Sequence, residues 1–98
     1  MAYGIVLVFG DATEEQYWAV NKELGINPDG TGDWPDGLVA HTGGPIEGGG
    51  LVVVEQWTSK AAHEAFMAGR LGAALAAVSV PAPTSITEFD VVNTHHLG

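Results

Sequence analysis

Three side chains in this sequence could take part in proton transfer: His41, Glu55 and His63. An imidazole can act as a general base near neutral pH, and a carboxylate enclosed in an apolar cleft can serve in the same way. His63 falls in the first turn of a predicted helix, where the helix dipole favours the neutral ring. Each residue also has a simpler interpretation: a partly buried imidazole bonded to a backbone carbonyl for His41, and a solvated side chain for His63 and Glu55.

Other common chemistries have little support. The sequence has no cysteine, which excludes thiolate nucleophiles, disulfides and cysteine-ligated metals. His95 and His96 are adjacent, so in a strand they would point to opposite faces and could not bind one ion. The glycine-rich segment 43–50 lacks the Gly-Lys-Ser/Thr ending of a phosphate loop and is interpreted as a hairpin turn. We therefore expect no metal site and no organic cofactor.

The charge balance limits the possible partners. Twelve acidic residues against three basic ones give a net charge of −9, so little is available to neutralise phosphate groups, and we expect neither nucleic acid nor membrane as a partner. The sequence shows neither the pattern of a signal peptide nor an apolar run of the ~20 residues that a membrane span requires. We expect a cytoplasmic protein with a single domain over residues 1–98.

The apolar pattern predicts the elements that would position these side chains. The central prediction is a buried strand over residues 51–57, followed at once by Ser59 as the cap of a helix. Thr13 and Gln16 have the spacing of a capping box, and Gly25 is a plausible left-handed end for the helix that they start. The remaining predicted elements are strands over 3–9, 38–42 and 86–94, a helix over 59–69 and a further short helix over 71–78.

The order strand, helix, strand, strand, helix, strand predicts a ferredoxin-like α+β fold, with an antiparallel sheet and both helices on one face. Strands 3–9 and 51–57 are apolar on both faces, yet the second face of such a sheet is bare. An exposed apolar sheet predicts an interface, and we expect a homodimer with its two sheets packed face to face. The turn-rich segment 27–37 is long for a connection and is interpreted as a lid.

Several of these residues carry a resemblance to a known family. The strand ends in Val54-x-x-Trp57-x-Ser59, Phe66 follows Ser59 by seven residues, and Gly69-Arg70-Leu71-Gly72 and Pro81-Ala82-Pro83 precede the last strand. In this pattern the chain resembles the dimeric α+β barrel superfamily, in particular small proteins similar to antibiotic-biosynthesis monooxygenases. The resemblance covers nearly the whole chain in element order and implies a ligand site between the sheet and the helices.

The resemblance implies that Trp57 and Phe66 line this site, and Tyr17 and Trp18 could close its other wall. Members of the superfamily include cofactor-free oxygenases, polyketide cyclases and haem-degrading enzymes. The haem-degrading branch is the least similar, because it relies on an asparagine in the first strand and a histidine late in the second helix. This chain has neither residue at those positions.

Two functions remain open at this point. The first is a cofactor-free enzyme in which His41 or His63 removes a proton from an apolar, aromatic or polyketide-like ligand. This enzyme would be either a monooxygenase, which is an oxidoreductase, or a cyclase. The second is a non-catalytic ligand-binding or structural homodimer in which the same residues fill a core. A cavity of roughly 300 Å³ or more, sufficient for a fused-ring ligand, would favour the enzyme, whereas a filled interface between helices and sheet would favour the second function.

Overall fold

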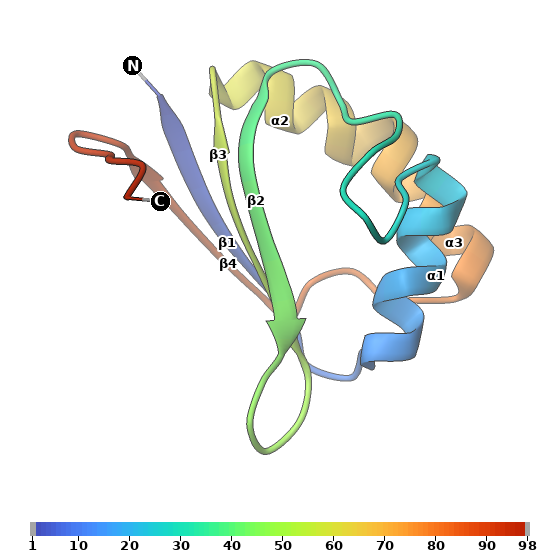
Figure 1. Cartoon of the computed structure of the whole chain (residues 1–98). Helices are drawn as coiled ribbons and strands as arrows, with labels where there is room; N and C mark the ends of the chain where they lie inside the picture. The colour runs from blue at the N-terminus through green and yellow to red at the C-terminus, as the bar shows by residue number, and fades with distance from the viewer. Residues whose placement is uncertain (1, 98) are drawn as a thin grey trace.

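The sheet and the helices form two layers, with the helices on one face of the sheet (Figure 1). The computed structural model describes residues 2–97. The elements follow in the order β1 (Tyr3–Phe9), α1 (Glu14–Leu24), β2 (Leu38–Pro45), β3 (Leu51–Trp57), α2 (Lys60–Phe66), the π-helical segment η1 (Met67–Leu71), α3 (Gly72–Val78) and β4 (Ser85–Asp90). Among the described residues, no helix is long and apolar enough to cross a membrane.

The four strands are antiparallel in the order β2-β3-β1-β4, which is the ferredoxin-like topology predicted from the sequence. The two apolar strands, β1 and β3, lie at the centre, and β4 is an edge strand. Two strands end at other residues than predicted. β2 continues to Pro45 because β3 offers it partners as far as Leu51, and β4 ends at Asp90, where its partner β1 begins at Tyr3.

Helix α1 has the predicted capping groups at both ends. The Thr13 hydroxyl accepts a hydrogen bond from the Gln16 backbone, and the Gln16 side chain accepts one from the Thr13 backbone. Gly25 ends the helix with φ of 79°, a left-handed conformation that glycine adopts without steric cost. These caps fix where α1 begins and ends, and therefore which of its side chains face the sheet.

The second helical region differs from the prediction. Instead of two separate helices, α2, η1 and α3 follow one another directly, and the middle segment forms a π-helix. The Arg70 guanidinium donates hydrogen bonds from this segment to the backbone carbonyls of Leu24 and Asp33. The region ends at Ser79, which has φ of 63°. The π-helical segment thus connects the second helical region to the end of α1 and to the following loop.

The core lies between the inner face of the sheet and the helices. Trp57, Ile5 and Leu7 are its largest fully buried side chains. On the outer face, Val54 and Phe89 keep 42% and 47% of their surface exposed, so the apolar second face predicted for the sheet is present in the single chain. Part of this face is crossed by the C-terminal segment, where the Thr94 hydroxyl donates to the Gln56 side chain.

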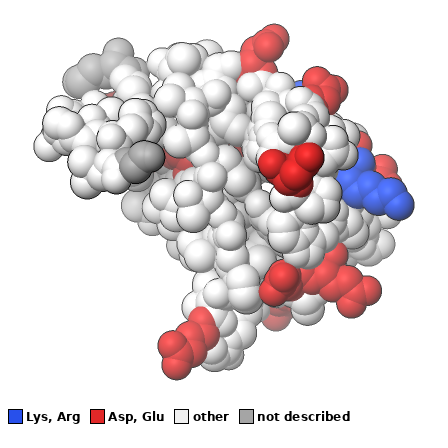
Figure 2. All heavy atoms as spheres, viewed as in Figure 1, with Lys and Arg blue, Asp and Glu red and all other residues white. Residues whose placement is uncertain are grey.

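Acidic side chains are spread over the molecular surface, and few basic side chains accompany them in the view of Figure 2. One of the three basic residues, Arg70, already pairs with Asp33 at 3.4 Å, and a second, Lys60, lies 3.8–3.9 Å from Glu64 and Glu88. The surface is therefore poorly suited to polyanions, as the composition predicts.

Candidate functional site

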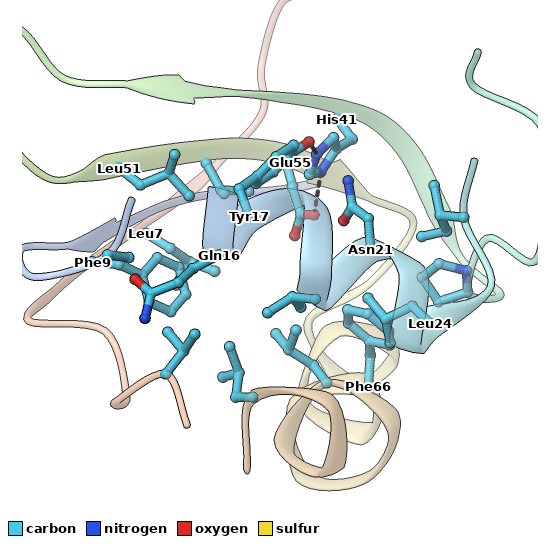
Figure 3. Close-up of a pocket in the computed structure, with 18 of the residues that line it drawn as sticks. Leu7, Phe9, Gln16, Tyr17, Asn21, Leu24, His41, Leu51, Glu55 and Phe66 are labelled. Atoms are coloured by element: carbon cyan, nitrogen blue, oxygen red, sulfur yellow. Dashed lines mark hydrogen bonds and ion pairs between the residues drawn. The ribbon is translucent and has the colours of Figure 1, made fainter. Parts of the chain in front are cut away.

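A chain of hydrogen bonds joins Tyr17, His41 and Glu55 on the helix side of the sheet (Figure 3). The Tyr17 hydroxyl lies 2.6 Å from His41 Nε2, and His41 Nδ1 lies 2.7 Å from Glu55 Oε2. His41 and Glu55 were predicted as separate candidates, and the structure brings them into direct contact. Tyr17, expected only as a wall residue, is the third member of this hydrogen-bonded chain of side chains.

The hairpin of β2 and β3 sets the first of these contacts. Its register places His41 directly opposite Glu55, and residues opposite each other in an antiparallel pair lie on the same face. Tyr17 reaches His41 from α1, and its ring passes over Gly43 of β2. A Cβ atom at Gly43 would lie 2.8 Å from the Tyr17 ring, so glycine permits this close approach.

The hydrogen-bond roles within the chain follow from the carboxylate. An ionised Glu55 only accepts hydrogen bonds, so His41 donates from Nδ1, and in the neutral form of the ring Nε2 presents its lone pair. The Tyr17 hydroxyl then donates to Nε2. The other oxygen of Glu55 accepts from the Trp57 indole at 3.1 Å, which fixes the carboxylate while it is only 8% exposed. The arrangement orients Nε2 of His41 toward the Tyr17 hydroxyl.

A largely apolar cavity lies between the sheet and the helices, beside this chain (Figure 3). Its volume is about 60 Å³. Its lining residues are Leu7, Phe9, Ala12, Gln16, Tyr17, Val20, Asn21, Leu24, Ile26, Trp34, Pro35, Leu38, His41, Leu51, Val53, Glu55, Phe66, Leu71, Leu75 and Val80.

This volume lies between the two outcomes expected from the sequence. The interface between helices and sheet is not filled, and a histidine of the hydrogen-bonded chain lines the space. The cavity is nevertheless smaller than the roughly 300 Å³ expected for a fused-ring ligand. A ligand of that size would enter only if the walls moved apart.

Only some of the other predicted site residues line the cavity. Phe66 and Tyr17 line the cavity. Trp57 is fully buried and lies behind the lining, where it donates a hydrogen bond to Glu55 and packs against the Phe66 ring with centroids 5.5 Å apart. Trp18 is 42% exposed and donates to Glu14 on its own helix, outside the lining set.

His63 is separate from the cavity. It is 4% exposed and packs edge-on against the Trp57 ring, with centroids 5.2 Å apart, and against the Tyr3 ring at 5.7 Å. Desolvation by this burial lowers the pKa of His63 and outweighs the opposing effects of nearby carboxylates, the largest that of Glu55. Its Nε2 atom has no hydrogen-bond partner among the residues that the structure describes. Burial thus favours the neutral form of the ring.

Asn21 and Trp34 are among the cavity residues that the sequence interpretation did not name. Asn21 follows Tyr17 by four residues on α1, which places both on one helix face, so this spacing was an available signal. Trp34 comes from the 27–37 loop, and its ring lies 5.4 Å from that of His41. No sequence spacing indicates that contact, because it depends on how the loop folds over the sheet.

The 27–37 loop covers one side of the site. Its path is fixed by a bridge between Ile26 and Gly32 and by a hydrogen bond from the Trp34 indole to the Gly30 carbonyl. Trp34 and Pro35 contribute to the cavity wall. The loop therefore occupies the position of a lid, and we retain its opening and closing as a prediction.

No group of three or more potential metal-ligating side chains is found within residues 2–97. The site as described consists of a proton-accepting chain and an apolar cavity, in a two-layer ferredoxin-like fold.

Comparison with solved structures supports this class of fold. A protein from Chloroflexus aurantiacus that is assigned by name to the antibiotic biosynthesis monooxygenases is 19% identical, with both chains covered completely and a TM-score of 0.68. SnoaB, a cofactor-independent oxygenase from Streptomyces nogalater, is 15% identical, with 95% of this chain and 94% of that chain covered and a TM-score of 0.57.

A third similar structure is that of MhuD with bound manganese protoporphyrin IX. MhuD is 22% identical to this chain, with a TM-score of 0.57, and the match covers 98% of this chain and 99% of the MhuD chain. No protein-family model matches the chain, and no curated protein does. The chain thus shares the ferredoxin-like fold of the antibiotic-biosynthesis-monooxygenase-like proteins over its whole length, as the sequence resemblance indicates.

Proposed function

We propose that this protein binds a small apolar, aromatic or polyketide-like ligand between its sheet and helices and removes a proton from it, without a metal or organic cofactor. The observation that carries the proposal is the Tyr17–His41–Glu55 chain at the wall of an apolar cavity. The resemblance to a cofactor-independent oxygenase is consistent with such chemistry. Oxygenase and cyclase reactions both begin with this proton transfer, so the proposal covers both.

In the proposed step, an acidic O–H or C–H of the ligand approaches the Tyr17 oxygen or displaces it from His41 Nε2. The proton passes to Nε2, either directly or by way of the Tyr17 hydroxyl, which takes the ligand's proton as it gives up its own. Glu55 stabilises the imidazolium that forms, because its carboxylate already accepts from Nδ1. The apolar walls exclude water and strengthen these electrostatic interactions.

Ionisation of a phenol tests the proposal directly. We suggest 2,6-difluorophenol, a single-ring phenol whose phenol and phenolate forms differ in ultraviolet absorbance. We expect the bound fraction to be more ionised than the free phenol at the same pH. His41→Phe should abolish this excess ionisation, whereas His63→Phe, a matched change at a histidine outside the cavity, should preserve it.

The result would contradict the proposal if the phenol bound without excess ionisation, or if His41→Phe ionised it as well as the wild type does. Loss of ionisation in His63→Phe alone would transfer the base role to His63. Circular dichroism of each variant would confirm that the fold is retained.

We also propose that the outer sheet face forms the interface of a homodimer. The exposed valine and phenylalanine side chains on this face, Val54 and Phe89, support an apolar contact. Val54→Asp should yield monomers or insoluble protein, because a charge buried without a partner is strongly destabilising. Native mass spectrometry of a Val54→Asp protein that remained fully dimeric would refute the face-to-face arrangement.

The alternative function is a ligand-binding or structural homodimer without chemistry. It predicts cavity binding without phenol ionisation, or no binding at all. Native mass spectrometry of protein purified without added ligand separates these cases, since a retained small molecule appears as added mass on the protein.

A further inference from the structure

The side chain of Asn21 has no role in the hydrogen-bonded chain described above. It is 7% exposed and lines the cavity, into which it projects from α1 (Figure 3). Within residues 2–97 its amide makes no hydrogen bond, although its backbone carbonyl accepts from Gly25 and Ile26. The amide atoms face the cavity without a partner among the described residues, so a ligand group in the cavity can form hydrogen bonds with them.

The position of Asn21 defines where that ligand group lies. Asn21 follows Tyr17 by one helical turn, with Cβ atoms of such pairs about 5–6 Å apart on one face. A ligand whose acidic hydroxyl meets Tyr17 and His41 can therefore present a second polar group to Asn21 across the width of one six-membered ring. Leucine side chains at 24, 71 and 75 form apolar walls of the same cavity.

The size of the cavity also favours a small ligand. A protein cavity of about 150 Å³ accommodates benzene, and this cavity, at about 60 Å³, is smaller. Even one aromatic ring therefore requires the walls to move apart, and a fused system requires a larger movement.

We infer that the ligand is a single ring carrying an acidic hydroxyl and a conjugated carbonyl, and that Asn21 donates a hydrogen bond from Nδ2 to the carbonyl oxygen. The inference rests on the proposed function. Loss of the hydroxyl proton to His41 delocalises negative charge through the ring onto the carbonyl oxygen. The Asn21 donor thus binds the anion more strongly than the neutral ligand, which favours the proton transfer.

A matched pair of ligands tests the role of Asn21. 4-Hydroxyacetophenone and 4-ethylphenol have similar shape and differ by a carbonyl in place of a methylene. We expect wild-type protein to bind the ketone about tenfold more tightly by calorimetry, the effect of one charge-assisted or buried hydrogen bond. Asn21→Leu, which has nearly the same volume, should reduce this preference to about twofold or less while it still binds 4-ethylphenol.

An amide NMR measurement provides a second readout that needs no variant. The Asn21 side-chain NH₂ resonances should shift on addition of 4-hydroxyacetophenone and remain unshifted with 4-ethylphenol. Equal affinities of the wild type for the two ligands, or a preference that survives in Asn21→Leu, would overturn the inference. Because 2,6-difluorophenol carries no carbonyl, its ionisation would still report on His41, so the two proposals fail separately.

Ring number is tested with phenol and 2-naphthol. An unrestricted apolar pocket would bind the naphthol more tightly, because it buries more apolar surface. We expect this small cavity to bind 2-naphthol more weakly than phenol, because the larger ligand requires a larger movement of the walls. Tighter binding of 2-naphthol would overturn the size limit.

Discussion

Replacing Gly43 with alanine should separate Tyr17 from His41 while the fold is retained. The new Cβ would lie 2.8 Å from one Tyr17 ring carbon and 3.0 Å from its hydroxyl oxygen. Carbon atoms pack at about 3.5–4.0 Å, so the ring must move by about 0.7 Å or more. If that movement is directed away from His41, the hydrogen bond lengthens from 2.6 Å to about 3.3 Å, beyond the usual range for a hydroxyl donor.

The effect on function should exceed the effect on stability. Overpacking costs about 1–3 kcal/mol, but glycine to alanine in a strand recovers about 0.5–1 kcal/mol, so the free energy of unfolding should fall by less than about 2.5 kcal/mol. A misplacement approaching 1 Å can reduce a reaction rate by about 100-fold. We therefore expect Gly43→Ala to lower the excess ionisation of 2,6-difluorophenol toward the level of His41→Phe.

Gly44 provides the control, because it is the next residue of β2 and a Cβ there would meet no atom within 4 Å. Gly44→Ala should leave phenol ionisation unchanged and unfold at equal or higher urea concentration. The reasoning would be refuted if Gly43→Ala ionised the phenol as the wild type does, or if both alanine variants lost ionisation equally.

Three further substitutions test the contacts around the site. Glu55→Gln leaves one of the two N–H donors, on His41 or Trp57, facing an amide NH₂. The free energy of unfolding measured by urea denaturation should therefore fall by about 2–4 kcal/mol. A fall of less than about 1 kcal/mol would count against the role of Glu55 as acceptor for both donors. Burial lowers the pKa of His63 below its ordinary 6.5, so the unfolded chain binds more protons just below pH 6.5 and stability should decrease as pH falls through that region. His63→Phe should flatten this pH dependence, and equal slopes of the urea midpoint between pH 7 and 5 in both proteins would contradict it. Arg70→Met removes the donors to two backbone carbonyls, of Leu24 and Asp33, so hydrogen exchange in the 27–37 loop should accelerate, and unchanged exchange would show that other contacts hold the loop.

Much of the fold could be predicted because its signals are local. The apolar runs at 3–9 and 51–57 give the two central strands, and the Thr13 capping box and Gly25 give the ends of α1. The π-helical turn at Met67–Leu71 was missed, since nothing in the local pattern distinguishes it from a break between helices. Its partners, the carbonyls of Leu24 and Asp33, are distant in sequence.

The candidate site was predicted only as separate residues. The pairing of His41 with Glu55 could have been derived, because a hairpin centred near Gly48 places the two residues opposite each other. The contact of Tyr17 with His41 could not, since it depends on how closely α1 packs on the sheet above Gly43. His63 was correctly placed on the second helix, but no local pattern indicates that Trp57 and Tyr3 enclose it.

The π-helical segment also determines which residues can form the cavity wall. Phe66 and Leu71 both line the cavity although they are five residues apart, a spacing that an unbroken α-helix would place about 140° apart around its axis. The wider π turn returns both side chains to the same side. A relative with one residue fewer here would rotate α3 by about 100° and turn Leu75 away from the ligand. Single-residue insertions and deletions in this segment would thus allow one scaffold to acquire cavities of different size during evolution while the sheet and its proton-accepting chain stay unchanged.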